Sequence, residues 1–171
     1  MPQTRSDTQE RRTKRKNADA SHIIPGIWIG NEKSSQDKNF FETRKIQAVL
    51  NCTPEVQNKF AAEGVEYMRI TLGDSRDPSD IKLMDDYLLH AASFIHKNHD
   101  IEGKNILIHC HQGIQRSVSC VTAYLMKHKG MSLKSAIKFL PTRRKQAFYE
   151  GTYLTFQEPL KKFESSVSQR T

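Results

Sequence analysis

The chain has 171 residues, a sequence pI near 9.5 and a formal net charge of +8 at pH 7. This length is enough for one compact domain with a substantial core. No apolar run reaches the roughly 18 residues that a membrane span needs, and the N-terminus is too polar for a signal peptide. The three cysteines, Cys52, Cys110 and Cys120, lack metal-type spacing, and their odd number argues against a disulfide framework, so we expect an intracellular protein of the cytoplasm or nucleus.

The first 20 residues carry six lysine or arginine side chains against three acidic ones, and no large apolar side chain after Met1. Such a segment buries too little apolar surface to offset the entropy lost on ordering. We therefore expect residues 1–20 to be a flexible basic segment and residues 21–171 to form the folded domain. The run Arg11-Arg12-Thr13-Lys14-Arg15-Lys16 fits a nuclear-import signal, a contact to RNA or another polyanion, or a solvated tail.

Strand and helix patterns alternate along the next part of the chain. Glycines bound a short strand over residues 26–30, and a buried strand over 46–51 precedes the turn signal Thr53-Pro54. Helical patterns lie on either side of the second strand, over 34–45 and 55–62. The latter ends at Gly64, which is suited to cap a helix C-terminus. A further strand is predicted over 65–70.

An amphipathic helix over residues 80–98 is the clearest predicted element of the second half. One face collects Ile81, Met84, Leu88, Ala91 or Ala92, and Ile95, with Ser79 or Asp80 as the cap. An apolar strand over 105–110 and helices over 117–129, 132–145 and 152–165 follow. This alternation indicates an α/β fold with a central, mostly parallel sheet flanked by helices. Ligands of such sheets bind beyond the carboxyl ends of the strands, which is where Cys110 falls.

The segment between the last strand and the next helix carries the strongest functional signal. Residues 109–117 read His-Cys-His-Gln-Gly-Ile-Gln-Arg-Ser, a cysteine followed by five residues, an arginine and a serine. A tight loop between a strand and a helix aims successive backbone N–H groups, and the positive end of the helix dipole, into one concavity that can hold an anion. The same field favours a thiolate, so we expect Cys110 to be a nucleophile at neutral pH.

Arg116 and Ser117 complete the chemistry predicted for this loop. The planar guanidinium of Arg116 matches two oxygens of a tetrahedral phosphoryl group, and the Ser117 hydroxyl is close enough in sequence to donate to the sulfur. We therefore predict removal of phosphate through a cysteinyl-phosphate. The residues expected to bind the substrate phosphate are His111, Gln112, Gly113, Ile114, Gln115 and Arg116. The alternative is a buried core cysteine at the end of a strand.

With these residues the chain resembles the dual-specificity phosphatases of the cysteine-dependent protein tyrosine phosphatase superfamily. The resemblance runs from about Ile24 to about Glu164 and includes Gly26-Ile27-Trp28-Ile29-Gly30, Ala48-Val49-Leu50-Asn51 and Ala123-Tyr124-Leu125-Met126. The stretch Ala147-Phe148-Tyr149-Glu150 is similar to the small viral H1-like members, which would place the protein in a virus-infected host cell. The resemblance implies a phosphatase-type fold and a pocket shallow enough for phosphotyrosine and for phosphoserine or phosphothreonine.

A proton donor for the leaving group should lie on a separate loop that reaches over the pocket. Residues 72–78, here called the aspartate loop, follow a strand and precede the long helix. The pattern Ile70-x-Leu72-x-Asp74 resembles the family pattern around its general acid, so Asp74 is the predicted acid. Asp77 stays open because the loop is slightly longer than in many relatives, and a turn aspartate without a catalytic role is a third interpretation.

The predicted function is a dual-specificity protein phosphatase with phosphoproteins as partners. An RNA 5′-phosphatase or triphosphatase of the same superfamily would explain the basic N-terminus and Arg143-Arg144-Lys145, but Ser117 stands where that subfamily carries threonine. A phosphoinositide phosphatase would favour lysines in the loop, which has none, and a catalytically dead phosphopeptide-binding module would lack the cysteine or the arginine. No metal, cofactor or membrane is expected, and a homodimer stays open.

Overall fold

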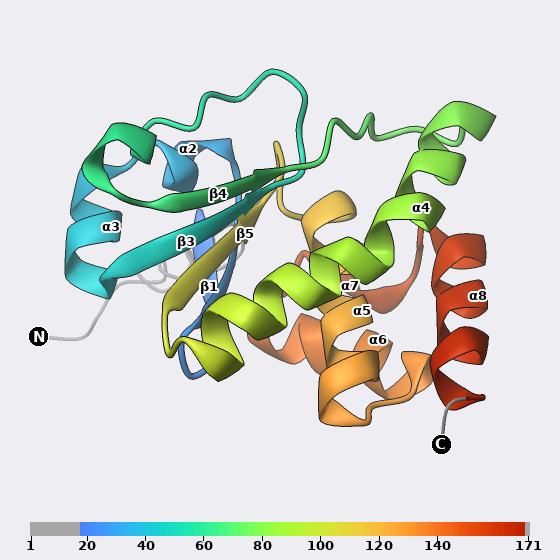
Figure 1. The fold of residues 1–171 in the computed structure, drawn as a ribbon. Helices are drawn as coiled ribbons and strands as arrows, with labels where there is room; N and C mark the ends of the chain where they lie inside the picture. Colours follow the sequence, from blue (N-terminus) through green and yellow to red (C-terminus); the bar gives the residue numbers. More distant parts are fainter. Residues whose placement is uncertain (1–17, 170–171) are drawn as a thin grey trace, which may run out of the picture.

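The computed structural model describes residues 18–169, and these confirm the expected α/β fold (Figure 1). A five-stranded sheet has the order β1-β2-β5-β3-β4, with β1 antiparallel to β2 and every other pair parallel. The strands are β1 (Ala20–Ile24), β2 (Ile27–Gly30), β3 (Ile46–Asn51), β4 (Glu66–Arg69) and β5 (Asn105–His109).

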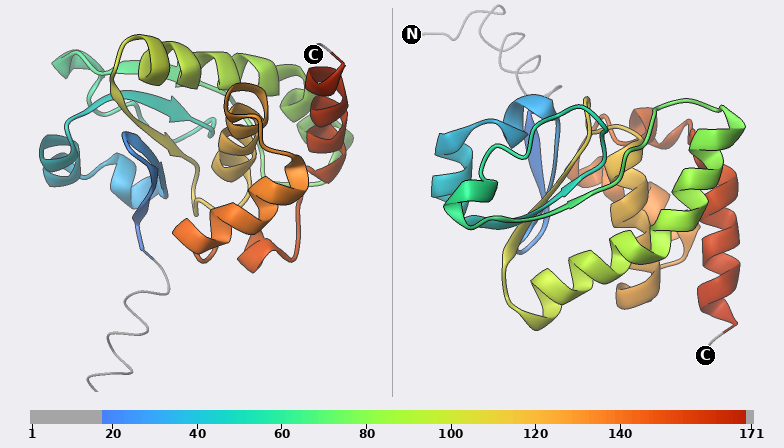
Figure 2. Two further views of the ribbon diagram at one scale, coloured as in Figure 1. Left: turned by 90° about the horizontal axis from the view of Figure 1, so that it is seen from below. Right: turned by 45° about the horizontal axis from the view of Figure 1, so that its top comes forward.

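Helices lie on both faces of the sheet, with the larger group on one side (Figure 2). The smaller elements are α2 (Glu32–Ser35), α3 (Lys38–Arg44) and the 3₁₀ turn η1 (Ala61–Glu63). The larger group contains α4 (Pro78–Ile95), the π-helical turn η2 (His96–Ile101), α5 (Arg116–Lys129), α6 (Leu133–Arg143), α7 (Phe148–Gly151) and α8 (Gln157–Ser168).

The alternation of side chains along the central strand β5 divides the core between the two faces. Ile106 and Ile108 belong to the large cluster that also holds the apolar faces of α4, α5 and α8, whereas Leu107 packs in a smaller cluster with Phe41 and Phe60. Helix α5 is buried from its first residue to Met126, because the sheet and three other helices surround it. The connection from β5 to α5 is therefore held rigidly at both ends.

Before residue 64 the structure differs from the prediction in one strand and two helices. Strand β1 was not predicted, and the carbonyls of Ala18 and Asp19 just before it accept hydrogen bonds from Arg144 and Asn31. Residues 1–17, with the basic run 11–16, lie outside the described part, so the expected flexible segment stays a prediction. The helix predicted over 34–45 is two helices, because Asp37 caps a second one by accepting from Phe40 N at 3.2 Å.

The helix predicted over residues 55–62 is absent, and only η1 precedes Gly64, whose φ of 87° confirms the predicted cap. The reason is long-range, because side chains from the sheet occupy the backbone groups that a helix would use. The Val56 carbonyl accepts from Asn51 Nδ2 and Arg69 Nη2, both at 2.8 Å, and Val56 N donates to Thr53 Oγ1.

The long helix and the last helix differ from the prediction mainly at their ends. Helix α4 begins at Pro78 and passes into η2 after Ile95, and the predicted apolar face is buried at Met84, Leu88, Ala91, Ala92 and Ile95. The final helix starts at Gln157 rather than near residue 152, because Gln115 holds the backbone of Tyr153 and Thr155 in a loop. No helix within residues 18–169 is long and apolar enough to cross a membrane.

Candidate active site

Cys110 follows the last residue of β5 and is almost completely buried, with 1% of its surface exposed. Its Sγ accepts a hydrogen bond from the backbone N–H of Gly113 at 3.2 Å and lies 3.3 Å from the Ser117 hydroxyl. The structure thus brings together the predicted nucleophile and the predicted serine. We call residues 110–116 the cysteine loop.

The carbonyl groups of the cysteine loop point outward, away from the sulfur. The His111 carbonyl accepts from Glu32 N at 2.9 Å and the Ile114 carbonyl from Phe148 N at 3.0 Å, while the carbonyls of Gln112 and Gly113 accept from the Arg144 guanidinium. Because a trans peptide places its N–H opposite its C=O, the N–H groups of residues 112–115 face the other way. The contact from Gly113 N to the sulfur agrees with this direction, which is the one that an anion-binding loop needs.

Gly113 is required for the loop to pass so close to β2. Its φ is +67°, and a Cβ atom built there would lie 2.6 Å from the carbonyl oxygen of Gly30. Any side chain would therefore both strain the backbone and displace the strand.

Arg116 joins the cysteine loop to the aspartate loop. Its Nη1 donates to the Leu72 carbonyl at 2.8 Å, and the side chain is buried. Its Nε has no hydrogen-bond partner among the residues that the structure describes. Leaving a buried donor unpaired costs about 1–3 kcal/mol, so this atom is ready for an acceptor that the protein itself does not supply.

Asp80, which was expected to cap α4, instead anchors the aspartate loop. Its carboxylate accepts from Gly73 N at 3.1 Å and from Ser75 Oγ at 2.5 Å, so it holds both neighbours of Asp74. Asp74 itself is exposed on this loop. The rival candidate Asp77 occupies the N-cap position of α4, where its side chain makes no capping hydrogen bond.

The aspartate loop also touches the segment between α7 and α8. The Arg76 guanidinium lies over the ring of Tyr153, 5.0 Å from its centroid, and Gln115 of the cysteine loop donates to the Tyr153 carbonyl at 2.8 Å. Gln115 was expected to bind substrate, but its side chain is buried and committed to this segment. Only its backbone N–H belongs to the cradle.

The histidines on either side of Cys110 have surroundings that the sequence did not predict. The ring nitrogens of His111 contact carboxylates on both sides, Glu32 at 2.7 Å and Glu55, so the predicted substrate contact would involve the backbone of His111 and not its ring. His109 is fully buried, and burial lowers its pKa from 6.5 to about 4. It is therefore neutral at pH 7, and its Nε2 has no partner within residues 18–169.

Sequence reasoning missed the residues that hold the loops from a distance. Glu32, Arg144 and Phe148 carry no local signal, because each contacts the cysteine loop from a distant part of the chain. Asp80 was considered only as a helix cap, although it holds the aspartate loop. Arg144 was interpreted as part of a basic cluster and is in fact 1% exposed.

The other two cysteines, Cys52 and Cys120, are fully buried with their sulfurs 3.7 Å apart. Within residues 18–169 no group of three His, Cys, Asp or Glu side chains is placed to hold a metal ion.

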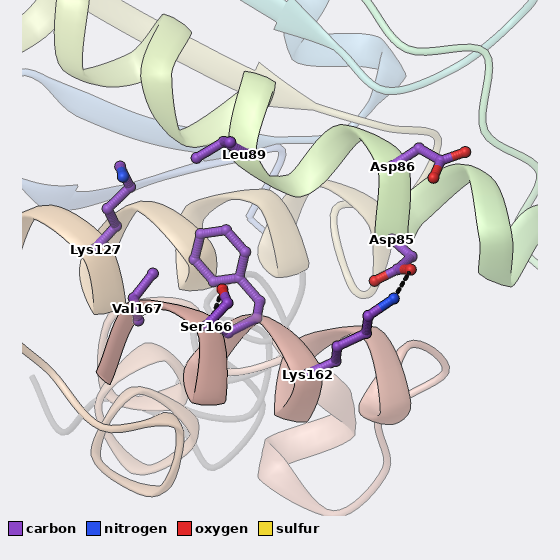
Figure 3. A pocket seen from close by; sticks show the side chains of 8 residues that line it. Asp85, Asp86, Leu89, Lys127, Lys162, Ser166 and Val167 are labelled. Atoms are coloured by element: carbon purple, nitrogen blue, oxygen red, sulfur yellow. Dashed lines mark hydrogen bonds and ion pairs between the residues drawn. The ribbon is translucent and has the colours of Figure 1, made fainter. Parts of the chain in front are cut away.

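One hollow borders the cysteine loop and is lined by Ala18, Asn31, His111, Gln112, Ile114 and Gln146. A groove also lies between α4 and α8, where it is bordered by Leu89 and Val167 (Figure 3). An ion pair between Lys162 and Asp85, at 2.6 Å, spans this groove. The groove contains no residue of either functional loop, so the predicted chemistry lies at the end of the sheet and not here.

Comparison with known proteins places this geometry in a family. The family model described as "Dual specificity phosphatase, catalytic domain" matches residues 27–165. The human protein named dual specificity protein phosphatase 21 is 33% identical over 124 residues, which cover 72% of this chain and 62% of that protein. Dual specificity protein phosphatase 1B of Arabidopsis thaliana is 31% identical over 149 residues, covering 87% of this chain and 84% of that protein.

Other relatives are longer than this chain, and solved structures agree on the fold. The Drosophila melanogaster protein named dual specificity protein phosphatase Mpk3 is 31% identical, but the match covers only 34% of its length against 86% of this chain. The crystal structure of human DUSP28 superposes with a TM-score of 0.76 at 20% identity, covering 88% of this chain and 96% of that one. At that identity the structural likeness shows the fold alone.

Proposed function

The chain belongs to the dual-specificity phosphatase family, and from that membership we propose that it hydrolyses phosphotyrosine, phosphoserine and phosphothreonine in proteins through a cysteinyl-phosphate on Cys110. One observation carries the proposal most directly. The buried Cys110 sulfur accepts from the Gly113 N–H and lies beside the Ser117 hydroxyl, in a loop whose carbonyls point outward. A nucleophile in a cradle of donors is suited to an anionic, tetrahedral phosphoryl group.

In the first step the Cys110 thiolate attacks phosphorus, and the bond from phosphorus to the leaving oxygen breaks. Asp74 donates a proton to that oxygen, which turns an alkoxide or phenoxide into a neutral alcohol or phenol. The N–H groups of Gln112, Ile114 and Gln115 hold the equatorial oxygens, while that of Gly113 contacts the sulfur. The Arg116 Nε, a buried donor without a partner in the described residues, would donate to one of them, while Nη1 keeps its bond to Leu72.

In the second step water attacks the cysteinyl-phosphate and the sulfur–phosphorus bond breaks. The Asp74 carboxylate accepts the proton of the attacking water and returns to its starting state. The departing thiolate is stabilised by the Gly113 N–H and the Ser117 hydroxyl, which contact the sulfur. The cycle needs no metal or other cofactor.

An RNA 5′-phosphatase is the less favoured function. The family model and the named relatives are protein phosphatases, and the buried Arg144 removes the centre of the basic cluster that had suggested RNA. A thiolate enzyme requires a reducing compartment, so we propose that the protein lies in the cytoplasm or nucleus.

Three further expectations remain predictions. They are a polyanion contact through residues 11–16, a homodimer and the viral H1-like similarity.

The test compares turnover of a phosphotyrosine peptide, a phosphothreonine peptide, an RNA 5′-triphosphate and a phosphoinositide by the full chain in one buffer with EDTA. Both peptides should be hydrolysed faster than the RNA 5′-triphosphate and the phosphoinositide.

A second experiment tests the nucleophile. Cys110→Ser should abolish turnover and prevent trapping of a covalent phosphoenzyme on rapid acid quench. The matched control is Cys120→Ser, another buried cysteine, which should keep turnover. More than a few per cent of activity in Cys110→Ser, or faster RNA turnover, would contradict the proposal.

A further inference from the structure

Arg144 is the largest side chain that is fully buried, and it lies directly behind the cysteine loop. Its Nε donates to the Gly113 carbonyl at 2.7 Å and its Nη2 to the Gln112 carbonyl at 3.1 Å. Its Nη1 donates to the Ala18 carbonyl at 2.9 Å and to Ser21 Oγ at 3.0 Å. One planar group thus connects two consecutive peptides of the loop to the start of β1.

This arrangement is unfavourable for the isolated fold. Within residues 18–169 Arg144 forms no ion pair, so its charge is buried against neutral oxygens only, and burial lowers its pKa to about 10. The guanidinium is still charged at neutral pH. Burying a charge without a counter-charge costs free energy. Part of this cost is compensated at longer range, because negative charge on the Cys110 sulfur and on the Asp19 carboxylate favours the charged form of Arg144.

We propose that Arg144 is a positioning residue for the reaction, which holds the Gln112 and Gly113 carbonyls outward so that the Gly113 N–H faces the sulfur and the Ile114 N–H faces the phosphoryl oxygens. The inference rests on the proposed function. Carbonyls left free would be able to turn toward the sulfur, and a carbonyl oxygen there would repel an anion. A cradle fixed beforehand costs no reorganisation when the transition state forms.

The geometry explains why this residue is an arginine. Arg144 is the C-cap residue of α6, with φ −131° and its N–H bonded to the Leu140 carbonyl at 2.8 Å, so the chain leaves the helix at this point. The rigid fork then reaches acceptors on both sides, which the single nitrogen of lysine does not span. Gly113 adds a steric condition, because a Cβ atom there would lie 2.6 Å from Arg144 Nη2.

The experiment measures binding of inorganic tungstate, a tetrahedral oxyanion, by titration calorimetry, alongside kcat and KM for p-nitrophenyl phosphate. Arg144→Met should weaken tungstate binding by about 10-fold or more, because the N–H donors of the loop are no longer aligned. It should also lower kcat/KM by about 10²-fold, with most of the loss in kcat. The matched control is Arg143→Met, the exposed neighbour, which should bind and turn over normally. Ser21→Ala removes one of the two acceptors of Nη1 and neither loop carbonyl, so it should also leave tungstate binding unchanged.

If Arg144→Met does not fold, Arg144→Lys takes its place, because it keeps the charge and most of the volume. It too should lose at least about 10-fold in tungstate affinity. A folded Arg144 variant with wild-type tungstate affinity would overturn the positioning role while leaving the proposed function intact. Conversely, if tungstate binding is lost in the Arg144 variants but the unaltered chain hydrolyses no phosphopeptide, the proposed function is overturned and the role of Arg144 in orienting the loop stays in place.

Discussion

Among single residues, the unpaired polar atoms concentrate where the chemistry is proposed. Within residues 18–169, three buried side-chain nitrogens lack a hydrogen-bond partner, and two of them belong to His109 and Arg116. Buried donors without partners are rare in folded proteins and are tolerated where a ligand completes them. We therefore interpret the Arg116 Nε–H as a donor to a phosphoryl oxygen of the substrate. His109 is different, because burial keeps its ring neutral.

Replacing Asp74 by asparagine tests the acid at this same scale. For an aryl phosphate with a poor leaving group, kcat should fall by about 10² to 10⁴, the usual effect of a positioned acid. The loss should shrink for an activated leaving group, which departs unprotonated. Asp77→Asn is the matched control, because Asp77 lies on the same loop and is exposed like Asp74. Equal losses on both substrates would indicate a structural role, and a larger effect at Asp77 would reassign the acid.

Among the elements, the aspartate loop depends on helix α4. Asp80→Ala removes both acceptors that hold Gly73 and Ser75, so Asp74 should lose its position without losing its carboxylate. We expect about a 10-fold lower kcat on a poor leaving group and a smaller change on an activated one, the same leaving-group signature as Asp74→Asn. Asp86→Ala, which removes only an exposed ion pair with Lys82, serves as control. Loss of the same size on both substrates would contradict this.

Strand β1 provides a second test at the element scale. Removing residues 1–17 should leave the melting temperature and the turnover of p-nitrophenyl phosphate unchanged, because this segment has no large apolar side chain after Met1 to pack against the domain. Removing residues 1–21 deletes the Ala18 and Asp19 carbonyls and Ser21, which accept from Arg144 and Asn31. At about 1 kcal/mol for each hydrogen bond, the free energy of unfolding should fall by about 3 kcal/mol or more. Urea unfolding of the two truncated chains measures the difference, and equal stability would show that the domain starts later.

For the molecule as a whole, His109 should make stability depend on pH. Its pKa is about 4 in the folded protein and near 6.5 when unfolded, so the unfolded state binds more protons between these values. Stability is therefore complete above about pH 6.5 and declines as the pH falls toward 4, by about 2 kcal/mol at pH 5. Urea unfolding of the wild type and His109→Gln at several pH values should give free-energy differences that change by this amount. A constant difference across the range would show that His109 does not titrate as described.

Much of the fold and of the site could be predicted because the signals are local. Strands 46–51 and 105–110, the apolar face of the long helix and the order of Cys110, Arg116 and Ser117 depend on periodicity and spacing over a few residues. These patterns act within one element, so they keep their meaning before the chain folds. They were sufficient for the α/β class, the position of the cysteine loop and the family.

Only the tertiary structure decided how the peptide groups of the cysteine loop are oriented, with their carbonyls outward and their N–H groups inward. The Gly113 carbonyl is held by a residue 31 positions away, and the same guanidinium reaches the Ala18 carbonyl 126 positions away. Likewise, Phe148, Tyr149 and Glu150 have φ values near 50–60°, which are unfavourable for side-chain-bearing residues and persist only because the surrounding fold imposes them. Peptide orientation and buried polar contacts depend on partners that meet only when distant segments pack, and no local pattern encodes them.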